Sequence, residues 1–173
     1  MTPTLAGELA MTASFVVCVV VAYLFFMPWA RTVGVRKALV PLLGTHTGRH
    51  IALQLLSAQQ LGAFGISDAG RDQIIYGDVV GMILALVALV AVHQGWRSWR
   101  ALTWVFVAAT TLDLGNALVV GLREELFGVA QNVSWLILTF YVPLLWVTLA
   151  LVVWALIVLR VPKQRVAPPS VLA

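Results

Sequence analysis

The scarcity of charged residues constrains this chain more than any other feature of its sequence. Only 10% of its 173 residues are Asp, Glu, Lys or Arg, whereas 61% are hydrophobic. A soluble domain carries about a quarter charged residues. We therefore predict an integral membrane protein. The composition excludes a cytosolic enzyme domain and a conventional nucleic-acid-binding module, so we expect the lipid bilayer and no nucleic acid among its partners.

Long apolar runs divide the chain into membrane spans. A helix needs about 20 apolar residues to cross the hydrocarbon core of a bilayer. We predict an all-α bundle of five transmembrane helices that forms one domain over residues 1–160. The predicted spans are residues 9–29, 38–64, 73–94, 101–122 and 134–160. Residues 161–173 are predicted to be a disordered cytoplasmic tail.

The distribution of basic residues sets the predicted topology. Residues 38–64 are the most polar of the five runs, but treating them as a span makes the loops alternate between the two sides. One side then collects Arg31, Arg36, Lys37, Arg97, Arg100, Arg160, Lys163 and Arg165. The other side holds Arg71 and Arg123 beside four carboxylates. By the positive-inside rule, this predicts an outside N-terminus and a cytoplasmic C-terminus in the inner (cytoplasmic) membrane of a cell.

Two pairs of glycines have the spacing that brings membrane helices close together. Gly44 and Gly48 form one GxxxG motif in the second predicted span, and Gly77 and Gly81 form another in the third. Small residues four apart let two helix backbones approach closely. We expect internal packing between these two spans, with a homodimer through either glycine face as the alternative.

Polar side chains inside the predicted spans are the best pointers to function, because each ionisable group costs roughly 2.5–3.5 kcal/mol at the membrane centre. At a rise of about 1.5 Å per residue, Arg49, Asp78 and Asp113 all fall about 20 Å from the predicted cytoplasmic edge. Residues three and four apart share one face of a helix. The candidate site residues at or near this layer are His46, Arg49, His50, Gln54, Asp78, Asp113, Asn116 and Tyr141.

Three interpretations of this polar layer are open. In the first, Arg49 pairs with Asp78 or Asp113 in a purely structural network, as in an accessory or scaffold subunit. In the second, Arg49 and the histidines bind the polar end of a small amphipathic or lipid-like molecule, with passage of that molecule as an option. Arg suits this role because its planar guanidinium recognises carboxylates and phosphates.

The third interpretation is a metal or haem site. His46 and His50 have the i, i+4 spacing that places two imidazoles on one α-helical face, where a carboxylate of a neighbouring helix could complete a metal site. The same groups could serve an acid–base membrane enzyme. The positive charge of Arg49 beside a cation counts against the metal. Binding of a small amphipathic molecule is our working hypothesis.

Overall fold

The computed structural model describes residues 2–62 and 65–159, and all regular structure in these ranges is helical. Within them, four helical segments are long and apolar enough to cross a membrane: Pro3–Val33, Asp68–Gln94, Trp99–Arg123 and Asn132–Val158. This confirms an all-helical membrane protein with transmembrane helices. The tail predicted over residues 161–173 lies outside the described residues.

The first long segment consists of α1 (Pro3–Val21), a π-helical turn η1 (Ala22–Phe26) and α2 (Met27–Val33). Thr2 caps its start, because its hydroxyl oxygen accepts a hydrogen bond from the Leu5 N–H at 3.3 Å. Gly34, with φ of 80°, ends the segment and turns the chain back, a backbone conformation that favours glycine.

The next segment changes its helical geometry along its length. It runs through α3 (Val35–Thr47), a 3-10 helix η2 (Gly48–Leu53) and α4 (Gln54–Gln60). It carries the second predicted span, yet it is not among the four strongly apolar segments. Its α3 part contributes five fully or almost fully buried apolar residues to the core: Val35, Ala38, Leu39, Leu42 and Leu43.

Helices α5 (Asp68–Gln94) and α6 (Trp99–Arg123) form an antiparallel hairpin. Gly95, in the left-handed conformation with φ of 71°, ends α5. The guanidinium of Arg36, at the start of α3, donates to the carbonyl oxygen of Val92 at 2.7 Å. This bond covers a carbonyl group at the end of α5 that has no helical partner.

The last segment begins with two short helices, α7 (Leu126–Val129) and α8 (Asn132–Leu136). It continues through a second π-helical turn, η3 (Ile137–Tyr141), into α9 (Val142–Val158). Pro143 is the second residue of α9, and proline both lacks an N–H group and crowds the preceding turn. The wider π turn relieves this conflict without ending the helix.

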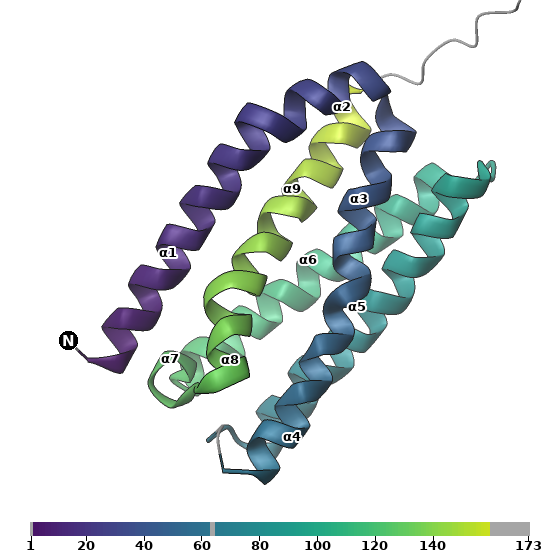
Figure 1. The fold of residues 1–173 in the computed structure, drawn as a ribbon. Helices are drawn as coiled ribbons and strands as arrows, with labels where there is room; N and C mark the ends of the chain where they lie inside the picture. The colour runs from purple at the N-terminus through teal and green to yellow at the C-terminus, as the bar shows by residue number, and fades with distance from the viewer. Residues whose placement is uncertain (1, 63–64, 160–173) are drawn as a thin grey trace, which may run out of the picture.

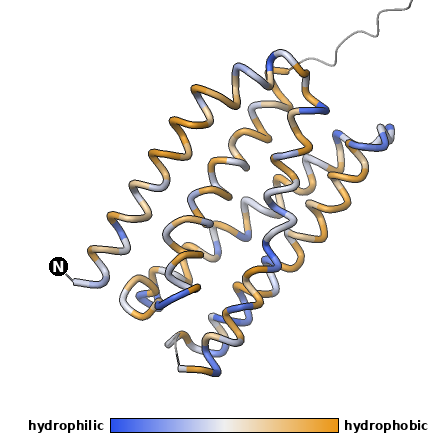
Figure 2. Tube along the Cα trace, viewed as in Figure 1, coloured by the Kyte–Doolittle hydropathy of each residue, from blue (hydrophilic) through white to orange (hydrophobic). Residues whose placement is uncertain are grey.

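Helix α9 lies in the interior of the bundle, in contact with α1, α3 and α6, whereas α5 packs against α3 and α6 (Figure 1). The turns after α2 and after α5 lie at one end of the bundle, and the turns after α4 and after α6 lie at the other (Figure 1). Hydrophilic residues gather at these ends, while the flanks, α1 above all, are apolar (Figure 2). Such a pattern is typical of helices surrounded by lipid.

Candidate functional site

Arg49 of η2 is the centre of a buried ion-pair layer, and its side chain is only 1% exposed. Its Nε donates to Oδ1 of Asp78, on α5, at 2.7 Å. One of its terminal nitrogens, Nη2, donates to Oδ2 of Asp113, on α6. The pairing that the first interpretation expects is therefore present, and one cation ties three helical segments together.

Two glycines of α5 make room for these side chains. A Cβ atom at Gly81 would lie 2.9 Å from Cζ of Arg49, and one at Gly77 would collide with the carboxylate of Asp113. The space beside both glycines is thus filled by side chains of the same chain. Gly44 differs, because a Cβ atom there would meet nothing within 4 Å. A homodimer through the glycine faces stays a prediction.

His46 is fully buried one turn before Arg49, on the same face of the segment. Its Nε2 lies 3.1 Å from Oγ1 of Thr148, on α9. The Thr148 hydroxyl donates its proton to the carbonyl oxygen of Leu144 at 2.7 Å, so its oxygen accepts from an Nε2–H of His46. The imidazole also meets the Phe106 ring edge-on at a centroid distance of 5.0 Å. His46 therefore packs as a core residue between α6 and α9.

Three buried side-chain atoms in the described part of the chain have no hydrogen-bond partner: Nδ1 of His46, Nη1 of Arg49 and Oγ1 of Thr110. They come from α3, η2 and α6. Thr110 precedes Asp113 by one helical turn, just as His46 precedes Arg49. Buried polar side chains therefore continue for one helical turn beyond the ion pairs, with His46 on α3 and Thr110 on α6.

His50 and Gln54 are exposed on the outside of the bundle. The cause is the change to 3-10 geometry at Gly48, because three residues per turn keep positions three apart on one face and rotate position 50 away. The structure consequently leaves one predicted metal-ligating histidine buried and the other exposed. Within residues 2–62 and 65–159, no group of three or more His, Cys, Asp or Glu side chains could hold a metal ion.

Asn116 and Tyr141 make separate connections near the ion-pair layer. The side-chain oxygen of Asn116, one turn beyond Asp113 on α6, accepts from Nε2 of Gln73 at 2.7 Å and links α6 to α5. The hydroxyl of Tyr141 donates to the carbonyl oxygen of Thr45 at 2.9 Å and links η3 to α3.

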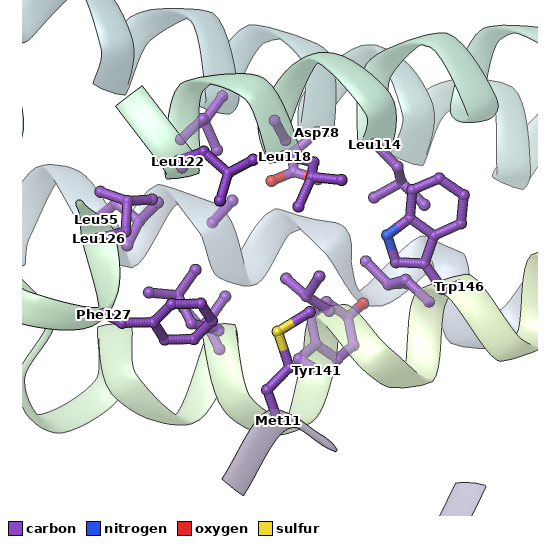
Figure 3. A pocket seen from close by; sticks show the side chains of 18 residues that line it. Met11, Leu55, Asp78, Leu114, Leu118, Leu122, Leu126, Phe127, Tyr141 and Trp146 are labelled. Atoms are coloured by element: carbon purple, nitrogen blue, oxygen red, sulfur yellow. The ribbon is translucent and has the colours of Figure 1, made fainter. Parts of the chain in front are cut away.

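An apolar pocket with a volume of about 90 Å³ lies beside this layer (Figure 3). Its wall includes Met11 of α1, Phe127 of α7 and a row of apolar side chains from α6. Asp78 is the charged residue in this wall, and the ring of Tyr141 lies against the same space. Leu118 and Leu122 of α6 also line the pocket, although they are 47% and 69% exposed. The pocket therefore borders the outer, lipid-facing side of α6.

The apolar wall of this pocket could not be predicted from the sequence. Met11, Phe127 and Leu122 come from three segments that are far apart in the chain. Each is an ordinary apolar residue of a membrane protein, so no spacing or composition signal distinguishes it. Of the wall residues, Asp78 and Tyr141 were predicted as site residues from their polar side chains.

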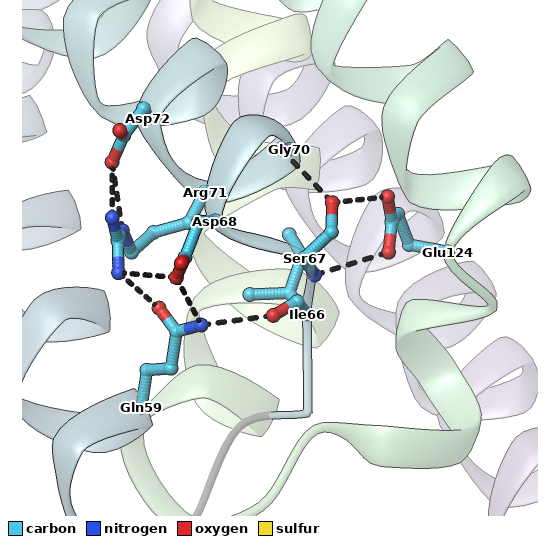
Figure 4. Close-up of polar contacts among 8 residues, drawn as sticks. All are labelled: Gln59, Ile66, Ser67, Asp68, Gly70, Arg71, Asp72 and Glu124. Carbon is cyan, nitrogen blue, oxygen red and sulfur yellow. Dashed lines mark hydrogen bonds and ion pairs between the residues drawn. The ribbon is translucent and has the colours of Figure 1, made fainter.

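At the end of the bundle that holds α4 and α7, a hydrogen-bond network closes the loop before α5 (Figure 4). Nε2 of Gln59 donates to the Ile66 carbonyl oxygen at 2.9 Å and to Oδ1 of Asp68 at 3.1 Å. Arg71 donates to Oε1 of Gln59 at 2.6 Å and pairs with Asp68 at 3.0 Å. These contacts fasten α4 to the start of α5.

Glu124 joins the same loop to the end of α6. It accepts from the Ser67 hydroxyl at 2.6 Å and from the Ser67 backbone N–H at 3.2 Å. These hydrogen bonds, the one from the hydroxyl above all, lower the pKa of the Glu124 carboxyl below its ordinary value. This pairing could not be predicted from sequence patterns, because the two residues are 57 positions apart.

The fold and the buried ion-pair layer define a helical membrane protein with a small apolar pocket. A protein-family model matches residues 7–157, and the chain belongs to this family, which is described as a domain of unknown function (DUF8737). The matched range includes both the ion-pair layer and the pocket. Comparisons with curated proteins and with solved structures give no match.

Proposed function

We propose that this protein binds a small amphipathic or lipid-like molecule in the pocket between α1, α5, α6 and η3. One observation carries the proposal: the wall is apolar except for the polar atoms of Asp78, Tyr141 and Trp146. Ligand pockets typically combine apolar walls with a few polar groups that orient the ligand. A hydrocarbon body would lie along the leucines of α6, with its polar end toward Asp78.

The geometry changes which residues we assign to the polar end of the ligand. Neither Arg49, which is bonded to two carboxylates, nor the exposed His50 lines the pocket, so neither is placed to hold a head group inside it. Asp78 and Tyr141 take that role in the proposal. Arg49, Asp113 and His46 position the helices around them.

The proposal includes five membrane spans, with Val35–Gln60 as the second. Its 13, 6 and 7 residues in α3, η2 and α4 cover roughly 39 Å at about 1.5 Å per residue, more than the ~30 Å hydrocarbon core. Two of its polar side chains, His46 and Arg49, are buried inside the bundle and bonded there, whereas His50 is exposed. Burial and hydrogen bonding lower the free-energy cost of placing these two side chains within a membrane.

The charges at the two ends of the bundle support the proposed orientation. Arg31, Arg36 and Arg97 lie at the end with the α2–α3 and α5–α6 turns. Asp68, at the start of α5, and Glu124, at the end of α6, lie at the other end. The positive-inside rule then favours an outside N-terminus and a cytoplasmic C-terminus in an inner membrane.

A second candidate is an accessory or scaffold subunit in which the ion pairs are only structural. It is favoured by one observation: the two carboxylates engage Nε and Nη2 of Arg49 and leave the guanidinium fully buried. In that case the pocket would be a packing gap without an occupant. The metal, haem and acid–base alternatives have no comparable support, because His46 and His50 are not brought together.

The experiment that separates the two candidates fills the pocket. Gly121 of α6 lines it, and a Cβ atom there would be 3.5 Å from Leu126, an ordinary contact. The variant Gly121→Phe should therefore occupy the space. Gly115, on the same helix and outside the pocket wall, has nothing within 4 Å of a Cβ atom, so Gly115→Phe is the matched control.

The measurement is native mass spectrometry of the three proteins after gentle extraction from membranes. We expect the wild type and Gly115→Phe to carry a bound small molecule that Gly121→Phe lacks. If all three proteins carry the same bound molecules, or none carries any, the pocket is not a binding site and the scaffold interpretation gains.

A further inference from the structure

The buried layer contains one more carboxylate than it has cations to balance. Asp78 is faced by the guanidinium of Arg49 from η2, by the carboxylate of Asp113 from α6 and by the neutral phenol of Tyr141 from η3. With all three ionisable groups charged, the layer carries one net negative charge. An uncompensated charge inside a membrane protein is costly unless a cation or a proton balances it.

The excess charge faces the pocket rather than the protein core. Arg49 engages one oxygen of each carboxylate, Oδ1 of Asp78 and Oδ2 of Asp113. Of the two residues, Asp78 is the one that lines the pocket. Its Oδ2 makes no hydrogen bond within residues 2–62 and 65–159. The pocket thus receives a carboxylate whose second oxygen is free to accept a hydrogen bond (Figure 3).

Two aromatic side chains in the wall suit a cation as well. The rings of Tyr141 and Trp146 both line the pocket. The face of an aromatic ring attracts a positive charge, and this attraction is stronger when the site excludes water. The phenol oxygen of Tyr141, whose proton is given to the Thr45 carbonyl, is a further hydrogen-bond acceptor.

We propose that the molecule bound in this pocket is an amphipathic cation, an amine or ammonium on a hydrocarbon body. Its head donates to Oδ2 of Asp78 and its body lies along Leu118, Leu122 and Phe127. An anionic molecule would bring a third negative charge to the layer, which disfavours it. This inference rests on the proposed binding function and specifies its ligand class.

The test compares three probes with the same eight-carbon chain: octylamine, octanol and octanoate. At pH 7 the amine is protonated, because alkylamines resemble Lys with a pKa of about 10.4. Binding is measured by isothermal titration calorimetry of the full chain in detergent micelles. The pocket-filled variant Gly121→Phe is titrated in parallel, so that the heat of partition into micelles can be subtracted.

We expect octylamine to bind the wild type about tenfold more tightly than octanol, with octanoate weakest, because hydrogen bonds to a charged group are among the stronger ones. Asp78→Asn should remove this preference. The variant is expected to fold, since Arg49 and Asp113 remain as a balanced pair. If the variant does not fold, the order of affinities of the three probes for the wild type still tests whether the pocket prefers a cation.

The outcomes separate the two proposals. If none of the probes binds above the Gly121→Phe background, the proposed binding function fails. If octanol or octanoate binds as tightly as octylamine, the binding function stands and the cationic ligand is overturned, because Asp78 then carries its own proton. Retention of the amine preference by a folded Asp78→Asn would also overturn it.

Discussion

At the scale of single residues, Arg49 connects three helical segments through its two ion pairs. It is long, charged and 1% exposed, and it bonds to carboxylates from two other helices. A buried charge is tolerated when its partners remain, and becomes a large cost when one partner is removed. Because two carboxylates share one guanidinium, removal of Arg49 leaves two unpaired negative charges. Removal of one carboxylate leaves a balanced ion pair.

The first prediction concerns the loss of this cation. Arg49→Met leaves Asp78 and Asp113 facing each other without compensation and should destabilise the protein by about 3–5 kcal/mol. Thermal unfolding in detergent, followed by circular dichroism, measures the change. Addition of Asp78→Asn and Asp113→Asn to Arg49→Met should restore most of the lost stability. Wild-type stability of Arg49→Met alone would show that the ion pairs do not hold the helices together.

The second prediction concerns Glu124, which lies outside the spans. Its carboxyl pKa is lowered in the folded protein by the hydrogen bonds from Ser67, so its ionised form stabilises the fold. This stabilisation is present above the ordinary pKa of a glutamate and is lost as the pH falls through the lowered pKa. Glu124→Gln should therefore reduce the loss of stability on acidification.

The control for this prediction is Glu125→Gln, because Glu125 is the neighbouring carboxylate and makes no hydrogen bond to Ser67. Melting temperatures recorded from neutral to acidic pH should fall less steeply for Glu124→Gln than for the wild type or the control. Parallel curves for all three proteins would contradict the role given to the Ser67–Glu124 contact.

At the scale of the helical segments, the α3–η2–α4 stretch shows where sequence patterns succeed and where they fail. Arg49 and Asp113 could be placed at one depth because they lie twelve and thirteen residues from Lys37 and Arg100. Asp78 lies six residues from Asp72 at the opposite edge, which gives the same depth in a ~30 Å core. His46 and His50 share a face only where the segment is α-helical throughout. The 3-10 geometry that begins at Gly48 does not meet this condition, and hydropathy carries no information about such a change.

The third prediction concerns the glycines of α5. Gly81→Ala would push a methyl group against the guanidinium of Arg49, which cannot move away while two carboxylates hold it. Overpacking of this kind costs about 1–3 kcal/mol. Gly44→Ala is the matched control, since its new methyl group would meet nothing within 4 Å. Equal melting temperatures for the two variants would argue against a tight α5–η2 contact.

At the scale of the whole molecule, composition alone predicted the class correctly. The described part of the chain is helical and contains four segments apolar enough to span a membrane. The proposed count of five spans depends on residues 35–60, in which other helices cover His46 and Arg49 but leave His50 and Gln54 exposed. The pocket could not be predicted, because Met11, Phe127 and Leu122 meet only once the bundle has formed.

The fourth prediction tests the number of spans and their orientation. In a Cys18→Ser background, Leu61→Cys and Ser98→Cys place single exposed thiols at opposite ends of the bundle. With five spans and an outside N-terminus, a membrane-impermeant maleimide should label Leu61→Cys in intact cells and Ser98→Cys only after permeabilisation. Labelling of both positions in intact cells, or the reverse pattern, would contradict the proposed topology.

The occupancy of the pocket is the central claim, and a structure of the wild-type protein in lipid nanodiscs tests it most directly. We predict elongated non-protein density between Met11 and Tyr141, with its polar end within hydrogen-bonding distance of Asp78. A pocket closed by the side chains of Leu118 and Leu122, with no density inside, would contradict the claim. It would leave the buried ion pairs as a structural feature of the bundle.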